Sequence, residues 1–170
     1  MSGTVDENAY RGLPGAIPYA FGRSNSILFK CYVLLGGLVA TLLGVFFVLG
    51  FINFVAVTAD TSATLAISRA FFVLIALAVV VPLLAPILLV ARRHRRGIGD
   101  DTQYDRRLAL SGFVFMLALY VGMIPTVPPE HQSEAGGMIT ATLYSVPWFV
   151  GIAIIGGAAA LIWGVHRRHR

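Results

Sequence analysis

The chain has 170 residues, of which 57% are hydrophobic and only 12% are charged, with a formal net charge of +5 at pH 7. Globular proteins average about 25% charged residues, and one soluble domain of this length could not bury so much apolar surface. The composition therefore excludes an ordinary soluble protein and indicates a single membrane domain over residues 1–170.

The first segment, residues 1–26, is rich in glycine, proline and aromatic residues. Glycine and proline at this density break regular structure, and tyrosine favours the membrane–water interface. We expect this segment to lie without regular structure along the cytoplasmic membrane surface. Ser24 and Ser26, at its end, are candidate N-cap residues for the helix that follows.

Four apolar segments dominate the rest of the chain. Each has about 20 residues or more, enough to cross a hydrocarbon core of about 30 Å at 1.5 Å per residue. Backbone groups in lipid need internal hydrogen-bond partners, so the segments must be helical. The sequence predicts an all-α bundle of four transmembrane helices, at about residues 28–57, 67–91, 108–127 and 144–165.

Basic residues gather on one side of this topology. Twelve of the 13 Lys and Arg residues lie within residues 1–30, in the basic loop 92–107 or in the C-terminal tail, and Arg69 is the exception. The positive-inside rule then places both termini and this loop in the cytoplasm of a multi-pass cell-membrane protein. The main topology anchors are Arg92, Arg93, Arg95, Arg96, Arg106, Arg107, Arg167 and Arg168.

The basic loop has other interpretations. Arginines near an anionic leaflet attract lipid headgroups by roughly 1 kcal/mol each, so we expect the bilayer and its anionic headgroups as partners. Nucleic acid is not expected, because the loop has one aromatic residue, Tyr104, and no recognisable binding module. Thr102 and Asp105 resemble a capping box that starts the third transmembrane helix about one turn before the lipid.

Small residues recur at every fourth position in two of the predicted helices. This spacing puts each set on one helix face, where a neighbouring backbone can approach closely. We predict close packing through these faces, either between the first and fourth helices or against other chains; frequent Gly and Ala in membrane helices is the simpler alternative. The residues are Gly36, Ala40, Gly44, Gly156, Ala160 and Gly164.

Proline and asparagine mark two further positions. Pro82 and Pro86 each remove a backbone donor and press on the carbonyl four residues earlier, which predicts a kink in the second helix. Kinks occur at gates and cavities as well as in static helices. Asn53 is a candidate for a polar contact inside the membrane, more readily between helices than with a ligand.

The sequence predicts no catalytic, cofactor or metal site. Functional groups in membranes are usually buried ionisable residues, and the predicted spans contain none at mid-depth. We place all four histidines in loops or the tail and interpret Cys31, the only cysteine, as a buried filler. Acidic and imidazole groups on the outer side, in the EHQSE segment 130–134, fit a solvated loop better than a cation site.

One stretch, residues 9–32, resembles the start of uncharacterised small four-helix membrane proteins of haloarchaea. The resemblance implies the same fold and an archaeal source, and it implies no activity. It depends on Tyr10, Arg11, Gly12, Gly15, Ala16, Pro18, Tyr19, Ala20, Phe21, Ser24, Ser26, Leu28 and Phe29.

Taken together, these features predict a structural or accessory subunit that packs against other membrane helices, in a homo- or hetero-oligomer. The alternative is a small oligomeric transporter or channel that uses the kinked second helix and Asn53. An enzyme is least favoured, because the spans lack an acid, base and metal that could act together.

Overall fold

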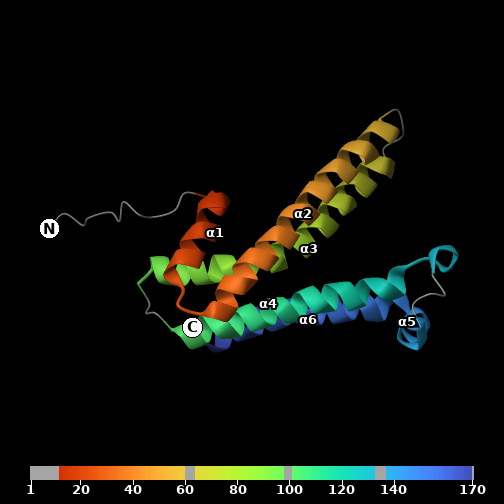
Figure 1. The fold of residues 1–170 in the computed structure, drawn as a ribbon. Coiled ribbons are helices and arrows are strands. Elements are labelled where there is room, and N and C mark those ends of the chain that lie inside the picture. Colours follow the sequence, from red (N-terminus) through yellow and green to blue (C-terminus); the bar gives the residue numbers. More distant parts are fainter. Residues whose placement is uncertain (1–11, 60–63, 98–100, 133–136, 170) are drawn as a thin grey trace.

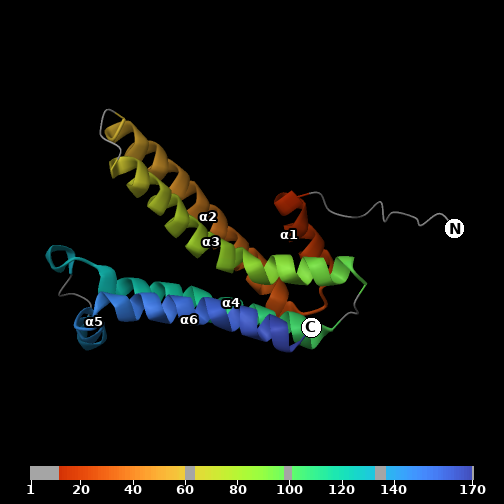
Figure 2. The ribbon, with the colours of Figure 1, turned by 180° about the vertical axis from the view of Figure 1, so that it is seen from behind.

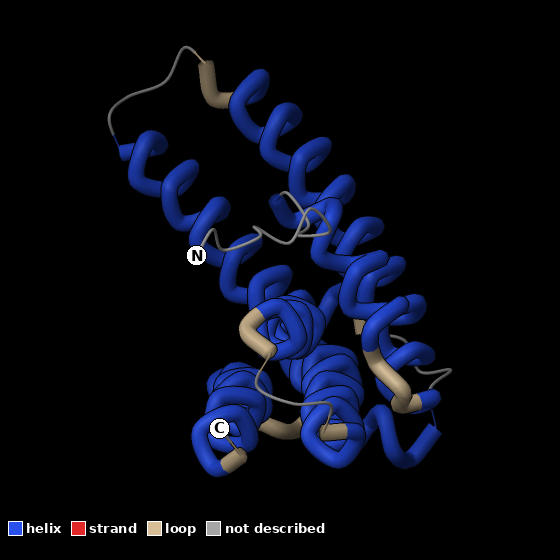
Figure 3. Tube along the Cα trace, turned by 90° about the vertical axis from the view of Figure 1, so that its left-hand side faces the viewer, coloured by secondary structure: helices blue, strands red, loops and turns tan. Residues whose placement is uncertain are grey.

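The computed structural model describes residues 12–59, 64–97, 101–132 and 137–169. Within these ranges the chain is helical and contains no strand (Figure 3). The elements are α1 (Gly12–Arg23), α2 (Ile27–Val57), α3 (Thr64–Arg95), α4 (Thr102–Met123), η1 (Ile124–Thr126), η2 (Pro129–His131), α5 (Gly137–Tyr144) and α6 (Trp148–Arg168).

Four helices are long and apolar enough to cross a membrane: α2, α3, α4 and α6. The all-α fold with four such helices is therefore confirmed. α3 and α4 extend beyond the apolar segments at the arginine-rich loop, because their polar ends continue the helix past the lipid-compatible residues. The fourth span begins at Trp148 rather than near residue 144, since Ser145, Val146 and Pro147 separate it from α5.

The long helices form two antiparallel pairs, α2 with α3 and α4 with α6 (Figure 1). The pairs meet where α2 and α4 begin and α3 and α6 end, and they diverge toward the other end (Figures 1 and 2). We call the meeting point the basic end, because the arginine-rich segments lie there. An apolar hollow of about 690 Å³ lies between the pairs, with Val39 and Leu43 of α2 opposite Met116 and Tyr120 of α4.

Helix α3 is bent, and the bend lies in its second half, the half that contains Pro82 and Pro86 (Figure 1). Proline removes the helical hydrogen bond to the carbonyl four residues earlier and its ring pushes that turn open. The bend lets the end of α3 cross under α2 and pack on α1 and α4. The predicted kink thus determines how the two pairs meet.

The buried core is concentrated toward the basic end. One cluster there joins α1, α2, α3 and α4 through residues such as Phe29, Tyr32, Ile87 and Leu108, all fully buried. Farther along, α2 exposes large apolar side chains such as Phe46. Exposed apolar surface on this scale is stable in lipid, which is as apolar as leucine.

Residues 12–23 form helix α1, so the predicted lack of regular structure is wrong for this part of the segment. Pro14 occupies the first helical turn, where the missing N–H would have had no helical partner. Pro18 interrupts the helix interior, and fully buried Ala16 and Ala20, in the core cluster shared with α3, stabilise α1 by packing. Residues 1–11 lie outside the described part of the chain.

Cys31 is exposed on α2, and its interpretation as buried filler is also wrong. Helical spacing puts Cys31, Leu34, Leu35 and Leu38 on one exposed side of α2, whereas the neighbouring Tyr32 and Val33 are buried.

Candidate functional site

The predicted topology anchors gather at the basic end. Arg92, Arg93 and Arg95 lie in the last turn of α3 and Arg96 directly follows it. Arg106 and Arg107 lie near the start of α4, and Arg167 and Arg168 end α6. Beneath them lies a set of polar side chains, which we call the basic-end cluster. Its members are Ser24, Arg93, His94, Tyr104, Asp105 and His166.

Asp105 is the centre of this cluster and is 1% exposed. The fully buried Ser24 hydroxyl donates to Oδ2 of Asp105 at 2.6 Å. Nε2 of His94, whose side chain is 5% exposed, lies 3.1 Å from the same oxygen. One carboxylate oxygen therefore joins the end of α1, the end of α3 and the start of α4.

The turn between α1 and α2 holds Ser24 in place. The Ser24 hydroxyl oxygen accepts from the Ser26 amide at 3.2 Å, and the Ser26 hydroxyl accepts from the Phe29 amide at 3.3 Å. Ser26 is thus the N-cap of α2, as predicted. Ser24 instead makes a contact that spans 81 positions of sequence.

Tyr104 forms the second part of the cluster and joins α4 to α6. Its hydroxyl lies 2.7 Å from Nδ1 of His166, and the Arg93 guanidinium stacks 4.2 Å from the centroid of its ring. Arg93 also donates to the backbone carbonyl of His169 at 2.7 Å and lies 3.8 Å from a carboxylate oxygen of Asp101. Together these contacts connect the ends of α3 and α6 to the start of α4.

The cluster is arranged to hold helices together rather than to activate a nucleophile. A Ser-His-Asp triad places histidine between serine and the acid, whereas here Asp105 lies between Ser24 and His94. No group of three His, Cys, Asp or Glu residues that could hold a metal ion occurs in the described ranges. Oδ1 of Asp105 and Nε of Arg93 are buried without a hydrogen-bond partner among the described groups.

The sequence-based predictions for several residues of the basic-end cluster differ from the structure. Asp105 is not part of a capping box: Asp101 caps α4 by accepting from the amides of Gln103 and Tyr104 at 3.0 and 3.3 Å. His94 lies within α3 and His166 within α6, so their assignment to loops and tail is wrong. Asp105 shares a helix face with buried Leu108, Ala109 and Gly112, a spacing that signals burial.

At the opposite end, Arg69 completes the terminus of α2. Its guanidinium donates to the hydroxyl of Thr58 at 2.9 and 3.0 Å and to the Thr58 backbone carbonyl. Cations at a helix C-terminus satisfy orphan carbonyls and interact favourably with the dipole. Of the acidic and imidazole groups in segment 130–134, Glu130 and His131 are exposed, and Glu134 lies outside the described residues.

The predicted packing faces are not used in the predicted way inside the chain. Helices α2 and α6 do not contact each other in the described part of the chain, so the suggested pairing of the first and fourth helices is wrong. Gly36 and Ala40 are buried, whereas Gly156 and Ala160 are exposed. Added side-chain carbons at Gly44, Gly156 and Gly164 would meet nothing within 4 Å.

Other glycines make the close approaches. A carbon added at Gly122 would lie 2.7 Å from the Gly151 carbonyl oxygen, and one at Gly151 would overlap the Gly122 carbonyl. The crossing of α4 and α6 therefore requires both residues to be glycine. Nothing in the sequence distinguishes Gly122 and Gly151 from the other glycines, because their contact depends on the packing register of α4 and α6.

Gly112 makes room for Tyr32, which braces the bend of α3. A carbon added at Gly112 would lie 2.6 Å from the Tyr32 hydroxyl oxygen and closer still to its ring. That hydroxyl donates to the backbone carbonyl of Leu83 at 2.7 Å, in the turn between Pro82 and Pro86. A side chain of α2 is thereby bonded directly to the backbone of α3 beside the proline bend. Asn53 is exposed on α2 and does not form the expected bond to another described helix.

These features define an all-helical protein with four helices that can span a membrane, joined at one end by a buried polar cluster. Residues 1–170 match the family model described as "Domain of unknown function (DUF8056)", and the chain belongs to this family. No curated protein and no solved structure matches the chain.

Proposed function

We propose that this protein is a small multi-pass subunit of the cell membrane that assembles with other membrane helices, either copies of itself or a different chain. It acts as a scaffold or accessory subunit and carries out no catalysis of its own. The likeness of residues 9–32 to haloarchaeal membrane proteins supports an archaeal source, which stays a prediction.

The observation that carries this proposal is the free face of α6. An α-helix turns about 100° per residue, so Gly156 and Ala160 lie opposite Ala158 and Ile162, which are buried in the core that α6 shares with α4. Faces of small residues in membranes allow another helix to approach closely. On α6 this face is turned away from the chain's own core and is available to a partner.

A second exposed stripe lies on α2. Leu42, Phe46, Leu49 and Asn53 follow one another at intervals of four, three and four residues, and all are exposed. An amide in a membrane-spanning helix gains by bonding to a partner helix, by about 0.6 kcal/mol on average. The exposed Asn53 therefore supports contact with a second chain near the end of α2.

The arginines support the orientation that we propose. Positive residues close to membrane helices are retained on the cytoplasmic side, and all eight predicted anchors lie at the basic end. We therefore place both termini and the connection between α3 and α4 in the cytoplasm. The positive surface there would also contact anionic lipid headgroups.

The transporter alternative has less support. The hollow beside the α3 bend is lined by apolar residues such as Pro82, Leu89 and Ile162. Tyr32 bonds the carbonyl of Leu83 within the bend, so the bend is held from the side by a buried side chain. The apolar lining offers no polar path for a solute, and the Tyr32 bond favours a bend of fixed shape.

Co-purification tests the subunit proposal. The tagged chain is extracted from its own membranes in a mild detergent, and the associated chains are counted by native mass spectrometry. Ala160→Leu places a bulky side chain on the free face of α6, and Ala78→Leu makes the same change at an exposed position of α3. We expect a stoichiometric partner, or a second copy, with the wild type and with Ala78→Leu.

With Ala160→Leu we expect that association to fall several-fold while the helix content measured by circular dichroism is unchanged. Recovery of the wild-type chain only as a monomer overturns the subunit proposal. Equal association of both variants overturns the assignment of the α6 face as the contact.

A further inference from the structure

We propose that α3 and α6 form a binding site for one anionic membrane lipid, with an acyl chain beside the bend of α3 and a phosphate headgroup at Arg92 and Arg96. This inference goes beyond the subunit role and does not require a protein partner. It rests on two adjoining hollows of different chemistry on the same helix.

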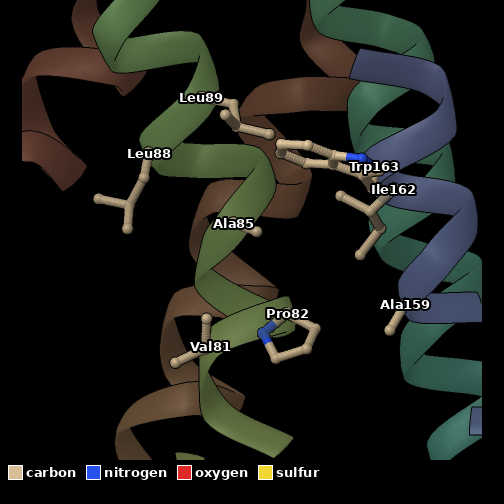
Figure 4. A pocket seen from close by; sticks show the side chains of 8 residues that line it. All are labelled: Val81, Pro82, Ala85, Leu88, Leu89, Ala159, Ile162 and Trp163. Atoms are coloured by element: carbon tan, nitrogen blue, oxygen red, sulfur yellow. The ribbon is translucent and has the colours of Figure 1, made fainter. Parts of the chain in front are cut away.

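The first hollow is an apolar groove between α3 and α6, with a volume of about 350 Å³. Figure 4 shows Pro82, Ala85 and Leu89 of α3 directed toward α6, with Ala159 and Ile162 facing them across the groove. The Trp163 side chain lies beside Leu89 (Figure 4). The groove lies along helices that can span a membrane, so an apolar occupant from the bilayer matches its chemistry.

The second hollow, of about 540 Å³, is lined by Leu88, Arg92, Arg95 and Arg96. Leu88 lines both hollows, which makes them neighbours along α3. Positions 81, 85, 88, 92 and 96 follow one another at helical spacing and therefore lie along one side of α3. The apolar groove and the pocket with three guanidinium groups therefore adjoin at Leu88, whose side chain is directed away from α6 (Figure 4).

The charge of the second hollow indicates the headgroup. Guanidinium groups bind phosphate through paired hydrogen bonds, and Arg92 and Arg96 are exposed at the end of a membrane-length helix. Arg167 stacks 5.1 Å from the centroid of the Trp163 ring and adds a further positive group next to the groove. By contrast, Arg93 is directed to Tyr104 and His169 in the basic-end cluster.

The dimensions distinguish a lipid chain from a partner helix. An α-helix is about 10 Å wide with its side chains, so a partner helix would lie across the mouth of a groove of about 350 Å³ and leave its interior unfilled. A single flexible chain can enter such a groove while its headgroup stays at the arginines. Free phosphate would satisfy the arginines but would leave the groove without an occupant.

Quenching of Trp163 by brominated lipids measures occupation of the groove. The chain has two tryptophans, so Trp148→Phe leaves Trp163 as the reporter. This protein is reconstituted in phosphatidylcholine vesicles that contain a small fraction of either brominated phosphatidylglycerol or brominated phosphatidylcholine. We expect stronger quenching by the anionic lipid at equal fractions, and no reversal by added inorganic phosphate.

Two double variants with the same change in charge test the headgroup pocket. Arg92→Gln with Arg96→Gln should reduce the preference for the anionic lipid about 25-fold, since each arginine near an anionic surface corresponds to about a fivefold factor and two such factors multiply. Arg106→Gln with Arg168→Gln removes two exposed charges from the same end and should retain the preference. If both double variants lose the preference for the anionic lipid equally, the specific site is overturned and only general attraction to the positive surface remains.

A substitution in the groove tests the acyl chain separately. Ala159→Leu fills the groove between α3 and α6 and should lower quenching by both brominated lipids, with unchanged helix content. Equal quenching of wild-type Trp163 by the two lipids overturns the proposal, as does displacement by inorganic phosphate. Association with partner chains is measured by co-purification, so either proposal can fail without the other.

Discussion

Ser24 and Asp105 are 81 positions apart in the sequence and are joined by a hydrogen bond of 2.6 Å between fully buried side chains. Because His94 lies 3.1 Å from the same carboxylate oxygen, Asp105 fixes the ends of α1 and α3 to the start of α4. A buried polar network of this kind favours one arrangement of helices, because its hydrogen bonds form only when the helix ends meet. The basic end is therefore the structural centre of the molecule.

Asp105→Ala should lower stability more than Asp101→Ala. The first change removes the carboxylate that Ser24 and His94 share and leaves the buried Ser24 hydroxyl without its acceptor, which costs about 1–3 kcal/mol. The second removes the exposed N-cap of α4, typically a loss of about 1 kcal/mol. The measurement is the apparent melting temperature in detergent, followed by size-exclusion chromatography after heating.

A double-mutant cycle makes the same prediction more specific. Ser24→Ala and Asp105→Ala remove two partners of one bond, so their effects should fall short of additivity by at least about 0.5 kcal/mol. Strictly additive losses would show that the Ser24–Asp105 bond does not contribute to stability.

Tyr32→Phe should destabilise the protein by about 0.5–1.5 kcal/mol, because the hydroxyl that bonds the Leu83 carbonyl is lost from a buried site. The matched control is Tyr120→Phe, which removes a hydroxyl from a side chain that is 72% exposed on α4. Urea or detergent titration of both variants gives the comparison. Indistinguishable midpoints would mean that the bend of α3 is stable without this brace.

The four spans and the bend could be predicted because their signals are local. Twenty apolar residues predict a span from composition alone, and Pro82 removes a helical bond whatever surrounds it. Helix α1 was missed because a count of Gly and Pro ignores position: Pro14 lies in the first turn, and buried Ala16 and Ala20 pack into the core that α1 shares with α3.

The basic-end cluster could not be predicted in the same way, because its contacts depend on how the ends of α1, α3, α4 and α6 meet. The sequence predicts a capping-box role for Asp105, and its burial follows only when α1 and α3 cover the start of α4. The prediction of the closely packed glycines was wrong for a related reason. A repeat of four shows that small residues share a face, whereas the register of α4 and α6 selects Gly122 and Gly151.

Gly151→Ala should disrupt the crossing of α4 and α6, whereas Gly157→Ala should not. The added carbon at Gly151 overlaps the Gly122 carbonyl, and forced repacking of this kind costs about 1–3 kcal/mol. At Gly157 the added carbon meets nothing within 4 Å, and alanine favours a helix over glycine by up to about 1 kcal/mol. The two variants should therefore shift the melting temperature in opposite directions.

Cysteine labelling in intact cells tests the proposed orientation. In a Cys31→Ser background, a membrane-impermeant maleimide should react with Met138→Cys, because Met138 is 86% exposed in α5, away from the basic end. Gly97→Cys and Arg168→Cys should react only after the membrane is opened, since arginine-rich ends are retained in the cytoplasm. The reverse pattern would place the basic end outside, where the anionic cytoplasmic leaflet could not supply the lipid proposed for Arg92 and Arg96.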